Sequence, residues 1–308
     1  MWILLAFISA LCLGFYDISK KIALRENRVI DVLTLSICFS ACLLLVPLLL
    51  SRLCPQVMEG THFFVPKLDA RAHLFTMLKS VIVLSSWVFA YISLKHLPLS
   101  VVSPMQATRP MWTLLGALLI FHEHLNTFQW IGVILAIGTI FVFSFGHKKI
   151  TLPLKEGTGL GFYYFALALA ILIGSCSGLY DKYLMRYYDH NAVQVYYTLY
   201  QSLMMLIVWT IDRFAQRQKT ASPLLHCPLS IVQIILISIF LIISDNVYML
   251  ALRDPASMIA IVSTIRRGGA VIGFAYGLIF LHESDVRRKV LCMLGILAGL
   301  ICLALGSI

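Results

Sequence analysis

The chain has 308 residues, of which 60% are hydrophobic and only 12% are charged, and its formal net charge is +10. Because soluble domains carry about 25% charged residues, this composition and a mean hydropathy of +0.90 exclude a soluble protein and predict a membrane protein. The basic residues form short clusters between apolar runs, without an aromatic-interleaved basic motif, so nucleic acid is not an expected partner.

Apolar runs divide the chain into segments long enough to cross a membrane, which takes about 20 residues. The first run starts at Met1 without a basic region or a cleavage site, so we interpret it as a retained helix rather than a signal peptide. The predicted fold class is therefore all-α integral membrane protein. Ten transmembrane helices are expected, at residues 2–23, 31–51, 72–94, 98–120, 126–146, 158–184, 191–211, 229–252, 256–281 and 288–307.

Two halves of the chain repeat the same motifs in the same order. GFYDISKK near residue 14 is similar to GLYDKYLM near residue 178, and the blocks that start at Tyr91 and Tyr248 align. We predict two repeats of five helices, residues 1–147 and 158–308. Because five crossings is an odd number, the second copy crosses in the opposite sense, giving a 5+5 inverted repeat. The paired residues are Tyr16/Tyr180, Asp17/Asp181, Pro98/Pro255, Ser100/Ser257 and Arg109/Arg266.

The distribution of lysine and arginine predicts an orientation. The loops that follow odd-numbered helices carry 14 of these residues, and the loops that follow even-numbered helices carry six. Because cytoplasmic loops are enriched in basic residues, this count places both termini outside the cytoplasm.

The sequence contains no pattern typical of a metal or cofactor site. Its eight cysteines fall mostly in apolar runs and form no C-x-x-C pair. The His122-Glu123-His124 run falls short of H-E-x-x-H, and we interpret it as a polar helix end. A Walker-type phosphate loop is also missing, so we expect no metal, no cofactor and no use of ATP.

The repeated motifs resemble the drug/metabolite transporter superfamily, in particular its EamA-type ten-helix members. The resemblance covers nearly the whole chain. It rests on the repeat, on GFYDISKK, and on YISLKHLPLSVVSPMQATRP followed by Glu123 and WIGVILAIGTIFV. The second copy reads YMLALRDPASMIAIVSTIRR and LCMLGILAGLICL.

This resemblance implies a secondary transporter that works by alternating access around a central cavity. Helices three, four, eight and nine, with the first and sixth, are expected to surround that cavity. Family members carry amino acids, nucleotide sugars, phosphorylated sugars or other metabolites. The sequence departs from the family at Arg109, before Pro110, and at Arg266-Arg267, where small or apolar residues are usual. The family places both termini in the cytoplasm, against the charge count.

Arg109 and Arg266 are the first candidates for a substrate site. A charge inside a span costs about 2.5–3.5 kcal/mol, so it usually faces a cavity or a partner. Two arginines from equivalent helices could bind a carboxylate or phosphate between the repeats. Alternatively, each arginine pairs with an internal acid and holds helices together. Arg267 points about 100° away from Arg266 on a helix, so we expect it to contribute less.

Acidic residues within the spans offer partners for these arginines. Asp245 could take a coupling proton or form a permanent ion pair with Arg266 or Arg109. Asp17 and Asp181 are expected near helix ends, in an interfacial charge cluster or a gate pair, and Lys79 is expected to snorkel. Further polar and aromatic residues on the expected cavity helices are candidates for substrate contacts: Gln106, Tyr91, Trp87, Tyr248, Ser263, Tyr16 and Tyr180.

The sequence thus predicts a secondary transporter for a small anionic or zwitterionic metabolite, with that metabolite and membrane lipid as partners. A membrane enzyme acting on a lipid-linked or phosphorylated substrate is the alternative, although the short loops lack paired acids. A scaffold without transport is disfavoured by the symmetric charges. The absence of long tails favours a bacterial inner membrane.

Overall fold

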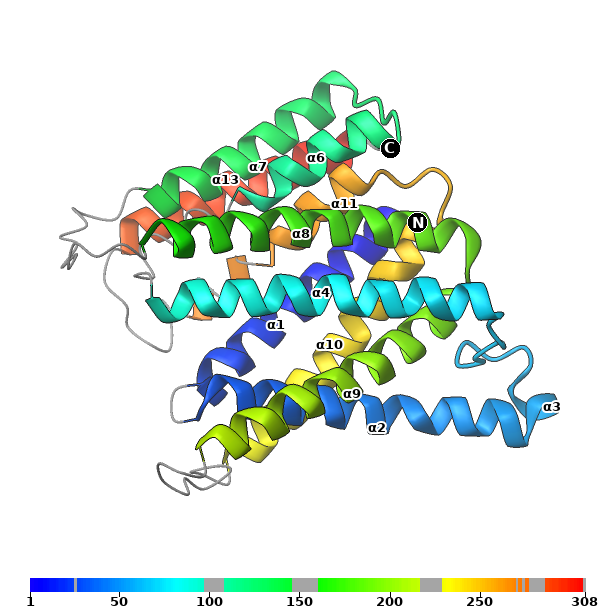
Figure 1. Cartoon of the computed structure of the whole chain (residues 1–308). Helices are drawn as coiled ribbons and strands as arrows, with labels where there is room; N and C mark the ends of the chain where they lie inside the picture. The colour runs from blue at the N-terminus through cyan, green and yellow to red at the C-terminus, as the bar shows by residue number, and fades with distance from the viewer. Residues whose placement is uncertain are drawn as a thin grey trace.

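The computed structural model describes residues 1–24, 27–96, 108–145, 160–216, 229–269, 271–272, 275–276 and 286–306. These residues form eleven helices and no strand. Figure 1 shows them as a bundle in which α1, α9 and α10 run obliquely to α2, α4 and α8. The helices are α1 (Trp2–Leu24), α2 (Val29–Leu53), α3 (Pro55–Met58), α4 (Ala70–His96), α6 (Arg109–Ile120), α7 (Thr127–Phe145), α8 (Leu160–Tyr187), α9 (His190–Gln216), α10 (Leu229–Arg253), α11 (Ile259–Arg267) and α13 (Val286–Leu305).

The predicted membrane character is confirmed by helix length and composition. Segments of α1, α2, α4, α8 and α10 are long and apolar enough to cross a bilayer, the 25-residue α2 reaching a mean hydropathy of 2.5. Shorter apolar helices occur at Arg109–Ile120, Thr127–Thr139 and Met293–Leu305. The chain is therefore a multi-pass membrane protein whose described residues form helices and no strands, and the total of ten spans stays a prediction.

The helices present apolar side chains outward and small polar side chains inward. Leu4, Leu119 and Leu305 are 64%, 74% and 62% exposed, as expected for contact with lipid. Buried serines instead join neighbouring helices through backbone carbonyls. Ser9 of α1 and Ser244 of α10 each donate to the other's carbonyl, at 2.9 and 3.0 Å. Small hydroxyl residues let membrane helices approach closely and hydrogen-bond across the contact.

Helices far apart in the sequence form the main contacts of the bundle. α1 packs along α10, α4 along α8, α2 against α9, and α7 against α13. α2 and α9 are also joined by a buried charge cluster, because Asp31 accepts hydrogen bonds from Trp209 at 2.8 Å and Arg213 at 3.1 Å. The two halves of the chain are therefore interleaved rather than separate.

α11 is short and begins at a carboxylate from the first half of the chain. Glu123 accepts hydrogen bonds from the backbone N–H groups of Ile259 at 2.6 Å and Ala260 at 3.1 Å. Burial raises the pKa of Glu123, and these two hydrogen bonds partly oppose that shift. The residue expected only at a polar helix end thus caps α11 and satisfies two of its unpaired N–H groups. The predicted span 256–281 continues beyond the described residues.

The contact between α7 and α13 depends on glycine. A Cβ atom at Gly299 would lie 2.8 Å from the backbone nitrogen of Ala136 and 2.9 Å from the carbonyl oxygen of Gly132. Neither neighbour is the end of a flexible side chain, so the helices would have to separate. Gly138, also on α7, has open space where its Cβ would be.

These two glycines should respond in opposite ways to alanine. We expect Gly299→Ala to lower the free energy of unfolding by about 1–3 kcal/mol, because it overpacks a backbone contact. The control Gly138→Ala should be neutral or stabilising by up to about 1 kcal/mol, because alanine favours a helix. Unfolding in mixed detergent micelles measures both. Equal effects at the two positions would contradict the packing assigned to Gly299.

Candidate functional site

A cavity of about 320 Å³ lies among the helices and is lined from α1, α4, α6, α8, α9, α10 and α11. Its wall is unusually rich in charge for a membrane protein. The lining contains five basic and three acidic side chains. The basic ones are Lys20, Lys79, Arg109, Arg266 and Arg267, and the acidic ones are Asp17, Asp181 and Asp245.

Arg266 is held by an acid on the neighbouring helix. Its Nη2 donates to Asp245 at 2.7 Å and to the hydroxyl of Ser244 at 3.3 Å. Its guanidinium also lies 4.0 Å from the centre of the Tyr248 ring, a cation–π contact. Of the alternatives the sequence left open, the ion pair between Asp245 and Arg266 is therefore present in this structure.

A second ion pair crosses between α4 and α8. The Nζ atom of Lys79 lies 2.5 Å from Asp181 and 4.5 Å from the centre of the Tyr197 ring. The Lys79 side chain is only 3% exposed, so it does not snorkel to the interface as we expected. Asp181 likewise faces the cavity, while the adjacent Lys182 donates to Ser257 on the far side of α8. The buried pair with Lys79 replaces the interfacial cluster expected for Asp181, and the alternative of a gate pair stays a prediction.

Arg109 lies at the first residue of α6, directly before Pro110, which suits the first helical turn. Its backbone carbonyl accepts a hydrogen bond from Ser175 of α8 at 3.1 Å. The guanidinium packs over Gly174, where a Cβ atom would collide with it. Within the part of the chain that the structure describes, the guanidinium groups of Arg109 and Arg267 form no hydrogen bond or ion pair. Both line the cavity.

The structure brings most of the predicted site residues to this cavity. Tyr180 is the exception, because its hydroxyl donates to the carbonyl of Phe75 at 3.1 Å and its ring stacks on Tyr183. Gln106 lies outside the described residues, as does the side chain of Tyr91. The predicted residues found in the lining are Arg109, Arg266, Asp245, Trp87, Tyr248, Ser263 and Tyr16.

Two lysines in the lining, Lys20 and Lys79, are not among the predicted site residues, although a helical spacing marks both. Lys79, Val83 and Trp87 recur every four residues and so share one face of α4. Lys20 lies four residues after Tyr16 on α1, and its Nζ is 5.5 Å from the centre of that ring. Anchoring such a pattern on Trp87 or Tyr16 would have found both lysines.

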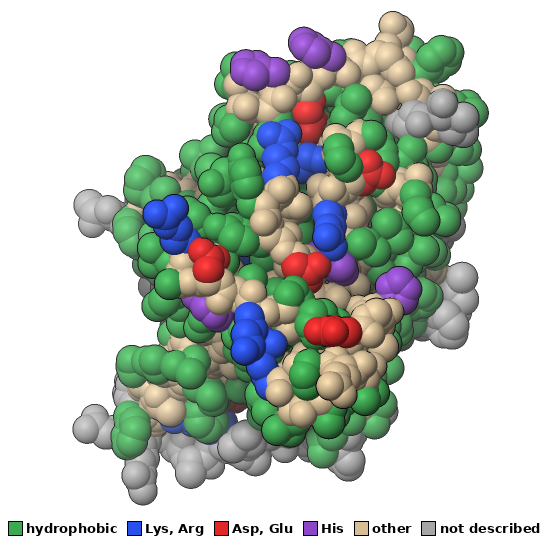
Figure 2. Space-filling view, turned by 90° about the vertical axis from the view of Figure 1, so that its right-hand side faces the viewer, with side chains coloured by type: hydrophobic (Ala, Val, Ile, Leu, Met, Phe, Trp, Pro, Cys, Tyr) green, Lys and Arg blue, Asp and Glu red, His purple; other side chains and the backbone are tan. Residues whose placement is uncertain are grey.

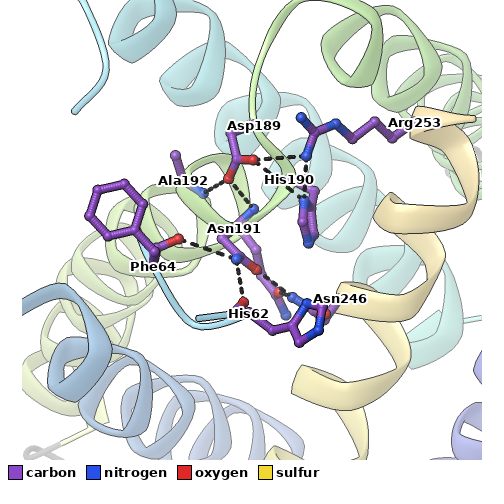
Figure 3. Close-up of polar contacts among 9 residues, drawn as sticks. His62, Phe64, Asp189, His190, Asn191, Ala192, Asn246 and Arg253 are labelled. Carbon is purple, nitrogen blue, oxygen red and sulfur yellow. Dashed lines mark hydrogen bonds and ion pairs between the residues drawn. The ribbon is translucent and has the colours of Figure 1, made fainter. Parts of the chain in front are cut away.

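One end of the bundle is closed by polar contacts around the start of α9. Figure 2 shows basic and acidic side chains interspersed over this end, bordered by hydrophobic ones. Asp189 caps α9 by accepting from the N–H groups of Asn191 at 2.9 Å and Ala192 at 3.3 Å. Arg253, at the end of α10, lies 3.0 Å from the other carboxylate oxygen of Asp189 (Figure 3).

A second set of contacts ties a loop to the same end. Asn191 donates to the carbonyls of His62 at 2.7 Å and Phe64 at 3.2 Å (Figure 3). The Asn246 amide of α10 donates to Asn191 at 2.9 Å and to Gln194 at 2.8 Å. α9, α10 and the loop before α4 are thereby joined.

A charged cavity between two interleaved halves of a helical membrane protein is typical of secondary transporters. The family comparison agrees: residues 1–145 match the model of the EamA-like transporter family. That family is part of the drug/metabolite transporter superfamily, and its members are transporters rather than enzymes. The predicted family resemblance is confirmed over residues 1–145 and stays a prediction for the second half of the chain.

Comparison with solved structures finds 28 matching chains. One, titled "Crystal structure of protein", has a TM-score of 0.74 and 10% sequence identity, over 99% of this chain and 96% of that one. At this identity the likeness is one of fold. A comparison with curated proteins gives no match.

The pair between Lys79 and Asp181 should be strongly coupled. Asp181→Asn leaves a buried ammonium without its counter-charge, so we expect a loss of about 3–5 kcal/mol in the free energy of unfolding. The double variant Lys79→Met/Asp181→Asn should recover much of this loss, because no uncompensated charge remains. Glu59→Gln, at an exposed position, is the control. Additive losses in the double variant would show that the two groups do not interact.

Asp189 should make stability depend on pH. Burial raises its pKa, but hydrogen bonds from His190 and Ala192 and the charge of Arg253 outweigh burial, so the net pKa is lowered. Its contribution is therefore complete above the unfolded pKa, about 3.9, and is lost as pH falls through the folded pKa. Near pH 7 we expect Asp189→Ala to cost about 1–2 kcal/mol. The gap from wild type should shrink below about pH 4 in thermal unfolding, whereas a constant gap would contradict the titration of Asp189.

Proposed function

We propose that this protein is a secondary transporter that moves a small organic anion, or a zwitterion with an anionic group, by alternating access. The observation that carries the proposal is the cavity lined by five basic and three acidic side chains. Two of the three acids already belong to ion pairs, Asp181 with Lys79 and Asp245 with Arg266. An anionic solute would balance the remaining positive charge.

Arg109 and Arg267 are the proposed anchors. A guanidinium presents a planar fork of donors that matches a carboxylate or a phosphate. Neither guanidinium forms a hydrogen bond or an ion pair with a described residue, although the charge of Asp17 acts on Arg267, whereas Arg266 is already paired with Asp245. Arg267 therefore has a larger proposed role in anion binding than we expected from its direction on the helix, and Arg266 has a smaller one.

Helix contacts support the proposed 5+5 inverted repeat of residues 1–147 and 158–308. The contact of α1 with α10 has its counterpart in that of α4 with α8. Serine hydrogen bonds recur in the same way: Ser238 of α10 donates to α2 at Ser36, at 2.8 Å, and Ser80 of α4 donates to α9 at Tyr197, at 3.2 Å. Both termini lie toward one end of the bundle (Figure 1), as an even number of crossings requires.

Alternating access would then require the closed end to open. The contacts of Asp189 with Arg253 and of Asn191 with Asn246 hold that end together. The most exposed charged side chains of the cavity are Asp17 and Arg267, which belong to α1 and α11. We infer that a solute reaches the cavity past these two residues in the present conformation. We also propose that transport takes place across a cell inner membrane.

The proposal is tested by ligand-induced thermal stabilisation of the purified protein, followed by flux in proteoliposomes. The panel contains carboxylates, sugar phosphates, nucleotide sugars and amino acids. A ligand that binds the folded state raises its apparent stability. We expect Arg109→Gln and Arg267→Gln to weaken binding of the active anion about 10- to 100-fold, the value of one charged hydrogen bond.

Arg71→Gln is the matched control, because Arg71 is an exposed arginine at the start of α4. It should leave affinity unchanged. Asp245→Asn should tighten anion binding, since it releases Arg266 from its ion pair. Stabilisation by neutral or cationic compounds alone, or full anion binding by both Arg109→Gln and Arg267→Gln, would contradict the proposal.

A further inference from the structure

An apolar groove of about 430 Å³ lies on the outside of the bundle between α2, α10 and the segment around α3. α2 contributes Leu43, Val46 and Leu50 to its walls, and α10 contributes Ile239 and Ile243. All ten residues that line the groove are apolar, and these five are exposed. An engineered apolar cavity of about 150 Å³ already binds benzene. The groove therefore has room for a larger apolar group.

The groove exists because α2 and α10 touch at one point and then diverge. Ser238 of α10 donates to the carbonyl of Ser36 of α2 at 2.8 Å, and from this contact the two helices separate toward α3 (Figure 1). Leu44 and Ile242 lie at the bottom of the groove, packed in the apolar cluster around Val65. The result is a wedge-shaped space between two helices.

The position of the groove matches one leaflet of a bilayer. Its helical walls lie within the apolar segments Val29–Leu53 and Ile231–Arg253, both long enough to cross a membrane. Leu43 lies ten residues before Leu53, the last residue of α2, which is about 15 Å along a helix. Because the hydrocarbon core of a bilayer is about 30 Å thick, the groove extends from one end of the bundle to about the bilayer centre. A lipid acyl chain of that leaflet has the same reach.

Packing makes this groove a binding site rather than ordinary lipid-exposed surface. A chain in the bilayer is already in an apolar medium, so hydrophobic transfer gives it little reason to prefer the protein. Dispersion contacts decide instead, and their number depends on the shape of the surface. A chain beside a single helix is contacted on one side, whereas a chain in the groove is contacted by α2, α10 and the residues beneath it. The groove therefore retains a chain that other surfaces exchange.

The segment that follows α2 indicates which headgroup suits the site. It lines the groove with Met58 and Phe63. It also carries exposed polar residues, which are Gln56, Glu59, Thr61 and His62. The sequence from Cys54 to Pro66 contains no lysine or arginine, and Arg52 just before it already donates to Tyr196 and to two backbone carbonyls. Because anionic headgroups collect at basic clusters, a zwitterionic headgroup fits this segment better.

The groove shares its walls with the closed end of the bundle. Asn191 donates to the carbonyls of the two residues that flank Phe63, and it accepts from Asn246 of α10 (Figure 3). Asn246 lies three residues after Ile243, about one helical turn. A chain packed against Phe63 and Ile243 therefore spans the same two elements that Asn191 joins. Opening this end would pull one wall away from the other, so a chain that binds the groove favours the closed state.

We propose that this groove binds one acyl chain of a zwitterionic phospholipid from the leaflet at that end, and that the bound chain stabilises the closed end of the bundle. The phospholipid is then a partner with a fixed site and not only the surrounding solvent. The inference does not depend on which solute the central cavity takes.

The first experiment locates the chain on the unmodified full-length protein. The protein, purified in detergent, is irradiated with a phosphatidylethanolamine that carries a diazirine in one acyl chain, and mass spectrometry identifies the labelled residues. We expect the label to concentrate on residues 43–50 and 239–243 rather than on other exposed apolar positions such as Leu119 and Ile207. Unlabelled phosphatidylethanolamine should compete at least about threefold better than phosphatidylglycerol or the free fatty acid of the same chain.

The second experiment fills the groove and measures lipid affinity from the thermal stabilisation of lipid-depleted protein. We expect Val46→Trp and Ile243→Trp to lower the affinity for phosphatidylethanolamine about threefold to tenfold, because the indole takes the space of the chain. Val232→Trp is the matched control, since Val232 is 51% exposed against 56% for Val46 and lies on α10 outside the groove. Asn191→Ala should also lower the affinity, because it releases the wall that carries Phe63.

Even labelling of the lipid-exposed helices would overturn the inference, as would equal competition by phosphatidylglycerol or the fatty acid. Unchanged affinity in both groove variants or in Asn191→Ala, or an equal loss in Val232→Trp, would overturn it too. A dimer that dissociates in the groove variants, measured by native mass spectrometry, would show that a second copy of the chain fills the groove instead. The labelling experiment needs no variant, so it decides the question even where a tryptophan substitution prevents folding.

Discussion

A charge buried in a membrane must be paired with an opposite charge or stay in contact with water, and this constraint organises the structure. Asp31, Asp181 and Asp245 each lie within 3.1 Å of a basic side chain on another helix. Each pair removes the cost of an isolated charge in a medium that solvates it poorly. The same constraint leaves Arg109 and Arg267 facing the cavity, where water or a solute can reach them. One set of charges thus serves both stability and binding. The charges that have a partner stabilise the bundle, and those without one are available to a solute.

The packing of the bundle makes that division possible. Serine hydroxyls donate hydrogen bonds to backbone carbonyls, and Gly132 and Gly299 allow the backbones of α7 and α13 to come into contact. Because these contacts use little side-chain volume, the helices meet closely at the periphery. The larger polar side chains are left to fill the centre, where Gly174 makes space for the Arg109 guanidinium. The cavity is therefore a consequence of where small residues lie as much as of where charged ones do.

Sequence reasoning found the helices and about a third of the residues that line the cavity. Arg109, Asp245 and Arg266 stood out because a charge within an apolar run is rare. Lys79 and Asp181 were misplaced because each lies near a helix end in the sequence, whereas their distance across the bundle is 2.5 Å. Tyr180 was assigned to the cavity through its match to Tyr16, but its ring turns toward Tyr183.

The sequence by itself determined the membrane environment, the helices and the family. Long apolar runs are stable only as helices in a bilayer, and the repeated motifs can be recognised without a structure. It also set the excess of basic residues. The tertiary structure decided which charges meet. A helical residue's direction is fixed only relative to its own axis, so the choice of partner depends on how each helix is rotated and which helix lies beside it. That choice paired Arg266 with Asp245 and left Arg267 without a hydrogen bond or ion pair among the described residues.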